Sequence, residues 1–526
     1  GEGAVSIYHE PREGFDQRSW HMKEAQDYMN EVNKNVSRKE LKKWVGDQAE
    51  IHEFQVGSRV LKLSTGQIMS LYCLGQRNQA RQHIFSGGVL ADPVGRGKNR
   101  ISQVKPVHIT KGIYDEIIGI LTPEQKAYAD KVQQFLAKNC ADWGNNTSMI
   151  LYGYKKFNDD RYFPIRTSDN SHRTNDKNAG DNVSLYEIRN QGMTKSVIPG
   201  AKNALVIGDI IDVFADHVVG MANYDSFAVP LTDAMKWYNY KNEGMVGEFL
   251  ESDSVKEEID RVKGSKAKDY FIRLLKDING EASNATSTNI SNKLLANYKG
   301  AAVGGNIRVA IQQPTAFLRA SALMDPKDLI SALAGKPQIS KAKENSAIAL
   351  WKSWGYYETN MGQSMKQVIT GQSTIMDKIR DKSSVLAALG DEVTWGYLWN
   401  ACEREIRRTR PKLKVDSKEY LETVRRRFEE VIDQTQVVDT ILHRTQFMRS
   451  KDTLIKIEAS FMSEPQKSYN MLYRAALEPG QKKFVNKKFV RTAVVYVMTG
   501  ILTSLAAAVM DAWRDDDFSL KFGEKY

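Results

Sequence analysis

The sequence has 526 residues, of which 41% are hydrophobic and 26% are charged, a balance that excludes a disordered chain and predicts packed cores in several domains. The net charge of +11 is compatible with contact to nucleic acid or to anionic lipid without requiring either. The three cysteines, Cys73, Cys140 and Cys402, lie far apart, which argues against a disulfide scaffold and a zinc site.

Residues 1–143 are predicted to form an N-terminal helical region. The first residues, GEGAVSIYHEPREGF, lack the apolar segment of a secretory signal, and their start without Met fits a trimmed chain or release from a longer precursor. A helix is expected from Ser64 or Thr65, either of which is a suitable N-cap. Gly87-Gly88 ends the next helix, and Thr122 with Pro123 begins another as N-cap and first helical residue.

Residues 144–200 are predicted to form a β/loop insertion, because turn residues, aromatic residues and β-formers gather from Gly144 onward. Within it, residues 162–166 are expected to be extended, since Phe163 precedes a proline and is therefore disfavoured in the helical conformation. Residues 168–182 are strongly polar and predict an exposed loop.

Residues 201–334 are predicted to form a central helical region in which helices resume at Ala204. Asp209, Asp212 and Asp216 share one face of its first helix, and such a stripe of carboxylates is able to bind a divalent cation. A solvated acidic face is the alternative that we favour for these residues. His217 points toward the apolar face of the helix, so we expect a hydrogen-bonded core histidine.

Residues 335–490 are predicted to form a C-terminal helical region, which opens with a surface linker at 335–346. Trp395, Tyr397 and Trp399 are expected in a hydrophobic core. Two basic runs follow, and because glutamates are interspersed with their arginines, we favour solvated faces with salt bridges over nucleic-acid contact. The arginines that such a contact would use are Arg407, Arg408, Arg410, Arg425 and Arg426.

Residues 491–526 are predicted to form an apolar, membrane-active tail. The 19 residues from Thr492 to Met510 carry no charge, which is close to the about 20 that cross a bilayer as a helix. A buried core helix is the alternative, since the run contains Gly and Thr. The basic segment before the run is suited to anionic headgroups. The residues expected to contact a membrane are Lys482, Lys483, Phe484, Lys487, Lys488, Phe489, Arg491, Val494, Val495, Val497, Ile501, Leu502 and Leu505.

The predicted fold class is mainly α, an elongated multi-helix architecture with a small β/loop insertion around residues 145–200. No catalytic or cofactor-binding motif is recognised. Gly97-Lys98 is followed by Asn99 rather than by the Ser or Thr of a phosphate-binding loop, and the HExxH and GxSxG patterns do not occur. We therefore expect a non-enzymatic protein without a cofactor.

Six stretches carry a likeness to a known family. They are STGQIMSLYCLGQRNQARQHIFSGG, LTPEQKAYADKVQQFL, YGYKKFNDDRYFPIR, DIIDVFADHVVGMANYDSFAVPL, NIRVAIQQPTAFLRA and QFMRSKDTLIKIEASFMSEPQKSYNMLYRA. In this order they resemble the C-terminal region of phage and prophage polyproteins that contain large polyvalent protein-associated domains. The apolar run followed by WRDDD also resembles how those proteins end.

The resemblance implies an internal virion protein of the DNA-ejection type. Such a protein is packaged with the genome in the virion interior and is then delivered to the host envelope or cytoplasm. The implied partners are other phage virion proteins, further copies of the chain, packaged DNA and host membrane lipids. Two alternatives stay open: an enzyme module of a phage polyprotein that acts on nucleic acid or cell wall, and a DNA-binding scaffold protein without membrane contact.

Overall fold

The chain is mainly α-helical, which confirms the predicted fold class. A computed structural model describes residues 2–94, 103, 105–167, 201–240, 254–284, 315–348, 361–371, 375–435, 449, 463–477 and 485–514. The chain divides into two compact units. Unit 1 comprises Gly1–Thr288 and Asn360–Ser373, and unit 2 comprises Asn289–Thr359 and Thr374–Tyr526.

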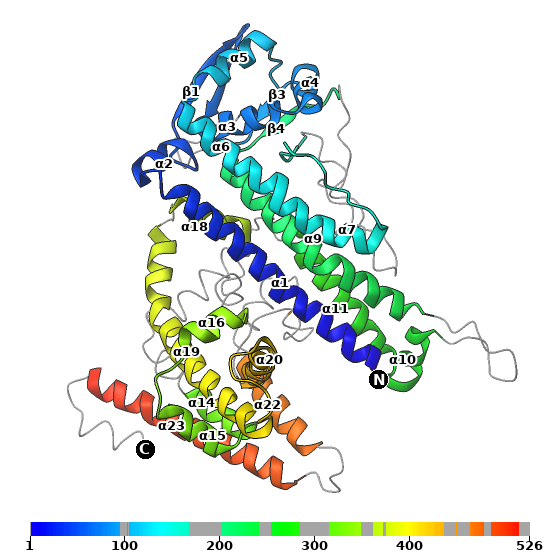
Figure 1. The fold of residues 1–526 in the computed structure, drawn as a ribbon, viewed down its shortest axis with the longest axis vertical. Coiled ribbons are helices and arrows are strands. Elements are labelled where there is room, and N and C mark those ends of the chain that lie inside the picture. Colours follow the sequence, from blue (N-terminus) through cyan, green and yellow to red (C-terminus); the bar gives the residue numbers. More distant parts are fainter. Residues whose placement is uncertain are drawn as a thin grey trace, which may run out of the picture. The chain divides into compact units, whose positions relative to one another are not determined.

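In unit 1, several helices pack against one long helix, α9, and the unit also contains two small sheets (Figure 1). Its elements are α1 (Glu2–Asn33), α2 (Arg38–Trp44), β1 (Ile51–Val56), β2 (Arg59–Ser64), α3 (Thr65–Gly75), α4 (Asn78–Gly87), β3 (Val89–Ala91), α5 (Lys111–Gly119), α6 (Pro123–Phe135), the π-helical turn η2 (Leu136–Cys140), α7 (Ala141–Tyr152), β4 (Leu205–Ile207), α9 (Ile210–Tyr238), α10 (Val255–Lys263), α11 (Ser265–Asn284) and α18 (Met361–Thr370).

The predicted helix boundaries with strong local signals are confirmed. Ser64 is the N-cap of α3 and forms a capping box with Gln67, and Thr122 does the same for α6 with Pro123 as first residue. α4 ends at Gly87, and Gly88 follows with a φ of 77°, a conformation that glycine adopts without strain.

The two sheets interrupt regions that were predicted to be helical. β1 and β2 form an antiparallel hairpin inside the N-terminal region, with a two-residue turn at Gly57 and Ser58. β3 and β4 pair in parallel, so a strand rather than a helix follows Ala204. The side-chain amide of Gln67 donates to the carbonyls of Asp92 and Ile207, which come at the ends of these two strands.

The predicted β/loop insertion is wrong for its first part, because α7 continues through Tyr152. Residues 162–166 are not helical, as expected, and the carbonyl of Arg166 accepts a hydrogen bond from the N–H of Val206. The polar loop predicted at 168–182 lies outside the described residues. The predicted domain boundaries at 143/144 and 490/491 fall inside helices, so neither separates two parts of the structure.

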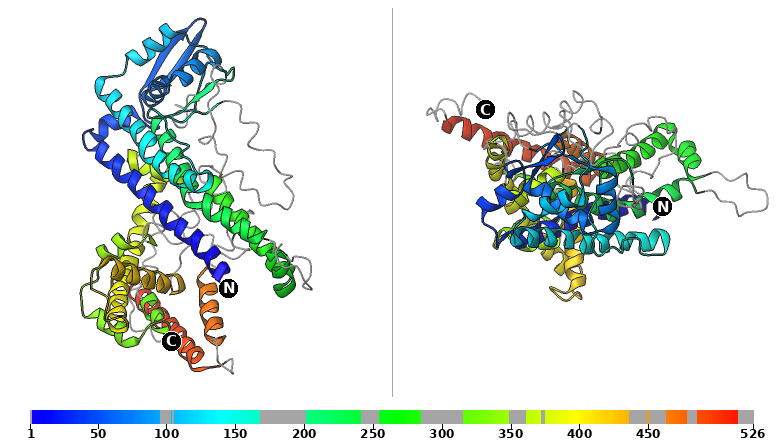
Figure 2. Two further views of the ribbon diagram at one scale, coloured as in Figure 1. Left: turned by 45° about the vertical axis from the view of Figure 1, so that its right-hand side comes forward. Right: turned by 90° about the horizontal axis from the view of Figure 1, so that it is seen from above.

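A buried carboxylate joins three helices of unit 1. Asp225, in the middle of α9, accepts hydrogen bonds from Nε2 of Gln17 at 2.6 Å and from Oγ1 of Thr147 at 2.8 Å. Its Oδ2 also lies 2.8 Å from Nε2 of His21. Gln17 and His21 belong to α1 and Thr147 belongs to α7, and both helices run along α9 (Figure 2). The carboxylate therefore fixes the register of both helices against α9.

The chain returns to unit 1 through α18, which packs on α9, α1 and α2. Met365 and Ile369 are buried there, and Asn33 donates to the carbonyl of Ile369 at 2.9 Å. Nζ of Lys366 lies 2.6 Å from a carboxylate oxygen of Asp212 on α9. Apolar burial and one ion pair thus hold this distant segment in place.

Unit 2 packs short helices against two long ones. Trp399 of α19 and Phe428 of α20 lie in its core with ring centroids 5.4 Å apart, and Trp395 is also buried, as predicted. The predicted linker at 335–346 is largely helical, because α16 packs on α19. The elements are α14 (Thr315–Arg319), the 3₁₀ turn η5 (Ala320–Ala322), α15 (Pro326–Leu333), α16 (Ile339–Asn345), α19 (Ile375–Thr409), α20 (Lys418–Thr435), α22 (Ser463–Ala476) and α23 (Lys487–Arg514).

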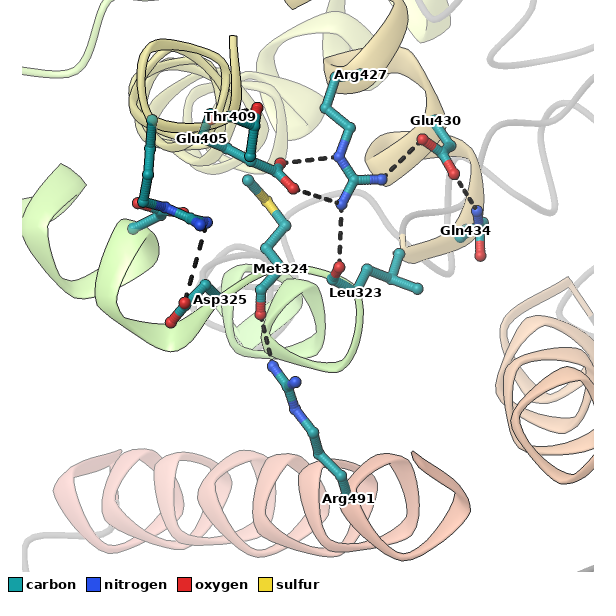
Figure 3. Close-up of polar contacts among 11 residues, drawn as sticks. Leu323, Met324, Asp325, Glu405, Thr409, Arg427, Glu430, Gln434 and Arg491 are labelled. Atoms are coloured by element: carbon teal, nitrogen blue, oxygen red, sulfur yellow. Dashed lines mark hydrogen bonds and ion pairs between the residues drawn. The ribbon is translucent and has the colours of Figure 1, made fainter. Parts of the chain in front are cut away.

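Two arginines bind the carbonyl groups that follow η5 (Figure 3). Arg427 of α20 donates to the carbonyl of Leu323 at 3.0 Å and also pairs with Glu405 of α19 at 2.8 Å. Arg491 of α23 donates to the carbonyl of Met324 at 2.6 Å. Helix ends leave carbonyls without intrahelical donors, so these cations attach α20 and α23 to the same turn.

Gly14 of α1 lies against a carbonyl of α9 that has no intrahelical donor. Pro230 has no N–H to offer the carbonyl of Ser226, four residues earlier. A Cβ atom at Gly14 would lie 2.5 Å from that carbonyl oxygen and 3.0 Å from the ring of Phe227. Only glycine therefore permits this close approach of α1 and α9.

We expect Gly14→Ala to lower the free energy of unfolding by about 1–3 kcal/mol, because the added methyl group overpacks a helix contact. Gly119→Ala is the matched control, since no atom lies within 4 Å of its Cβ position. It should leave stability unchanged or raise it by up to about 1 kcal/mol. Urea unfolding measures both, and equal effects of the two substitutions would contradict this account of the α1–α9 contact.

Candidate functional site

The helix α23 contains the whole uncharged run from Thr492 to Met510, and its N-terminus is held by Asn486. The side-chain oxygen of Asn486 accepts from the N–H of Phe489 at 2.9 Å, as an N-cap does. Its amide group donates to the carbonyl of Ala475 at 2.7 Å. Because Ala475 lies near the end of α22, one buried side chain joins the two helices.

Two threonines and a tyrosine of α23 lie on the side that faces the body of unit 2. Thr492 and Thr499 are each only 2% exposed, and their hydroxyls donate to carbonyls four residues earlier in the helix. Tyr496 is half-buried and its hydroxyl lies 2.8 Å from the sulfur of Met471 on α22. Polar groups that are paired in this way do not oppose burial of this side.

The opposite side of α23 presents aliphatic side chains to solvent. Their spacing of three or four residues places them in one stripe along the helix. Each is between 40% and 62% exposed. We call this stripe the apolar row, and its members are Val490, Val494, Val497, Met498, Ile501 and Leu502.

The predicted membrane-contact residues divide into four groups. Val494, Val497, Ile501 and Leu502 belong to the apolar row, and Lys487 and Lys488 are exposed at its N-terminal end. Phe489, Val495 and Leu505 are half-buried. Arg491 binds the carbonyl of Met324, a role that sequence alone does not reveal. Lys482, Lys483 and Phe484 lie outside the described residues.

Val490 and Met498 are members of the apolar row that the prediction missed. The signal was present in the sequence, because both continue the helical spacing of Val494, Val497 and Ile501. α23 is not a buried core helix, and no helix in the described part of the chain combines the length and apolar character needed to cross a membrane.

The predicted salt bridges of the two basic runs are confirmed. Arg408 lies 2.6 Å from Asp328, Arg425 lies 2.6 Å from Glu422, and Arg426 lies 2.8 Å from Glu422. Arg407 donates to the hydroxyl of Tyr420 and Arg410 is exposed. Carboxylates thus neutralise most of this charge, which weakens the case for nucleic-acid contact through these arginines.

The three aspartates of α9 do not form the solvated face that we favoured. Asp209 is 3% exposed and is the N-cap of α9, where its carboxylate accepts from the N–H of Ile211 at 3.0 Å and of Gly46 at 2.9 Å. Asp212 pairs with Lys366, and Asp216 is half-buried. Since capping and ion pairing already occupy two of these carboxylates, a structural role accounts for them.

Burial raises the pKa of Asp209 to about 6, with a further contribution from the negative charge of Asp212. Burial likewise raises the pKa of Asp216 to about 6, although Arg166 opposes the shift. His217 is buried as predicted and contacts the ring of Tyr162, with centroids 5.1 Å apart. Burial lowers the pKa of His217 to about 3, so its ring is neutral at pH 7.

Among the residues that the structure describes, no group of three or more His, Cys, Asp or Glu side chains is arranged to hold a metal ion. The low-weight expectation of a cation on Asp209, Asp212 and Asp216 therefore gains no support. Comparison of the chain with family models, with curated proteins and with solved structures found no match.

We expect the stability of unit 1 to depend on pH through Asp216. A carboxyl group whose pKa is raised in the folded state stabilises that state below its unfolded pKa, and the contribution is lost as the pH rises through about 6. Asp216→Asn should therefore be more stable than the wild type by about 1–2 kcal/mol above this pH, and the difference should shrink toward zero near pH 4.

Urea unfolding across this pH range measures the difference. Asp233→Asn is the control, because Asp233 is an exposed carboxylate on the same helix. A difference between Asp216→Asn and the wild type that stays constant with pH would show that burial of the charge does not limit stability here.

Proposed function

We propose that the chain is a non-enzymatic internal virion protein of a phage, packaged with the genome and delivered to the host envelope. In this proposal unit 2 attaches to the surface of the host membrane through the apolar row of α23. The single observation that carries the attachment is the apolar row itself, with Lys487 and Lys488 exposed at one end. The resemblance to phage polyproteins supports the viral setting.

The energetics favour a bilayer surface as the partner of the apolar row. Transfer of one fully exposed aliphatic side chain out of water is worth about 1.5–3 kcal/mol, so six side chains that are about half exposed offer on the order of 5 kcal/mol. Each lysine near an anionic membrane surface adds about 1 kcal/mol. Lys487 and Lys488 therefore favour anionic over neutral lipid.

The way α23 is attached to unit 2 supports binding in the plane of the membrane interface. Asn486 and Arg491 bind carbonyl groups outside α23, so rotation of the helix would break these hydrogen bonds and would expose the buried Thr492. The apolar row is therefore exposed in the protein before it binds lipid. A pre-ordered surface of this kind loses less conformational entropy when it binds than a segment that must first fold.

We expect the full chain to bind vesicles that contain anionic lipid. Val497→Asp with Ile501→Asp should weaken binding by about tenfold or more, because two exposed side chains that enter the bilayer in this proposal become charged. The control is Ile330→Asp with Leu333→Asp, two exposed apolar residues of α15 in the same unit. Vesicle co-sedimentation gives the apparent affinities, and circular dichroism checks that each variant is folded.

Equal vesicle binding by the two double variants would remove the basis for attachment through α23. Lys487→Gln with Lys488→Gln should weaken binding to anionic vesicles alone and leave binding to neutral vesicles unchanged. If the apolar row instead serves another protein chain, the aspartate variants would change the sedimentation coefficient of the chain and leave vesicle binding as it was.

The delivery step has its own test. Mass spectrometry of purified phage particles should detect this chain, and after adsorption to host cells the chain should be recovered with the host envelope or cytoplasm. The major capsid protein, which stays with the emptied particles, is the internal control. Recovery of the chain with the emptied particles would contradict delivery, whatever the result with vesicles.

A further inference from the structure

The outward side of α22 carries two exposed tyrosines whose rings lie almost parallel. Tyr469 is 64% exposed and Tyr473 is 47% exposed. Their ring centroids are 5.9 Å apart, and the angle between the ring planes is 16°. They are four residues apart, so they lie one above the other on the same helix face.

The opposite side of α22 is fixed to unit 2, which keeps the two rings in solvent. Met471 and Ala475 are buried on that side. Nζ of Lys467 donates to the carbonyl of Asp433 at 2.6 Å, near the end of α20. The ring pair therefore belongs to a helix that cannot turn without loss of these contacts.

A cation and an amide accompany the tyrosines on the outward side of α22. Arg474 follows Tyr473 directly and Asn470 follows Tyr469, and both side chains are exposed. Arg474 is exposed and follows Tyr473 in the sequence, whereas Arg425 and Arg426 pair with Glu422 within one helix. This combination differs from the basic runs, where carboxylates neutralise the charge.

Flat aromatic rings beside a cation are the elements that recognise single-stranded nucleic acid. Successive bases stack on aromatic side chains, while Arg or Lys neutralises the phosphates. The faces of bases are accessible in a single strand and are covered by neighbouring base pairs in a duplex. The net charge of +11 adds a general attraction to any polyanion.

We propose that the outward face of α22, formed by Tyr469, Asn470, Tyr473 and Arg474, binds single-stranded nucleic acid. Two neighbouring bases stack on the tyrosine rings, and the guanidinium of Arg474 binds the phosphate between or beside them. The contact reads no sequence, because every base has an aromatic face. It is independent of the apolar row on α23.

The test uses the full chain and a fluorescein-labelled oligothymidine of about 20 nucleotides, which is within the range that such surfaces cover. Fluorescence anisotropy should show binding that is stronger than binding to a duplex of the same length. Tyr469→Ser with Tyr473→Ser should weaken the binding by about tenfold per ring, whereas Tyr469→Phe with Tyr473→Phe should retain it. Arg474→Gln should lower the slope of log affinity against log salt by about 0.7.

Tyr152→Ser with Tyr154→Ser is the matched control. These two tyrosines of unit 1 are also exposed, and their ring centroids are 6.2 Å apart, but their planes are tilted by 42°. Nζ of Lys156 lies 5.2 Å from the centroid of the Tyr152 ring, so this control tests whether parallel rings are needed in addition to a cation. Affinity for oligothymidine should be unchanged in this variant. Equal loss in both serine variants, or no loss in the α22 variant, would overturn the proposal.

The competing partner for exposed tyrosines is a membrane surface, where such rings also collect. Vesicle binding by the α22 serine variant separates the two partners. Loss of vesicle binding with unchanged affinity for oligothymidine would overturn the proposal and assign this face to lipid. Loss of affinity for oligothymidine alone supports it, and this result does not depend on whether α23 binds vesicles.

Discussion

The need of every buried polar group for a partner is the constraint on which both units depend. In unit 1 the carboxylate of Asp225 is buried in the middle of α9 and is satisfied by Gln17 and Thr147. Without these donors a charge buried among helices would cost several kcal/mol. Because the donors come from α1 and α7, the charge can be buried only when three helices are in register.

The same constraint sets the orientation of α23 in unit 2. Arg491 reaches the carbonyl of Met324, which has no intrahelical donor, and Asn486 reaches the carbonyl of Ala475. The residues that carry hydrogen bonds therefore lie toward the body, and the aliphatic residues are left outside. The apolar row is therefore exposed because Arg491, on the other side of α23, binds the carbonyl group of Met324.

Sequence patterns predicted the elements whose cause is local. Ser64 and Thr122 were recognised as caps because an N-cap needs only its own helix. The hairpin of β1 and β2 was missed, although the turn at Gly57 and Ser58 is a local signal. β4 could not be predicted in this way, because a three-residue strand depends on pairing with β3 more than 100 residues earlier.

α7 shows why composition alone misled the prediction from Gly144 onward. Asn145 and Ser148 favour turns in an isolated peptide because their side chains compete for backbone groups. Here Asn145 exchanges hydrogen bonds with the backbone of Phe157, and the hydroxyl of Ser148 donates to the carbonyl of Tyr154. The polar side chains thus bind the segment that follows the helix, and the helix continues.

The return of the chain to unit 1 at α18 has a mechanical consequence. Residues of unit 2 precede and follow α18 in the sequence, so the polypeptide passes from one unit to the other three times. Cleavage of one of these connections leaves the two units linked by the others. If the chain is pulled through a narrow opening from its C-terminal end, α23 unfolds first and α18 unfolds later. α18 is then pulled off α9 while the first 288 residues of unit 1 are still folded, so the order of the sequence dictates the order in which the two units come apart.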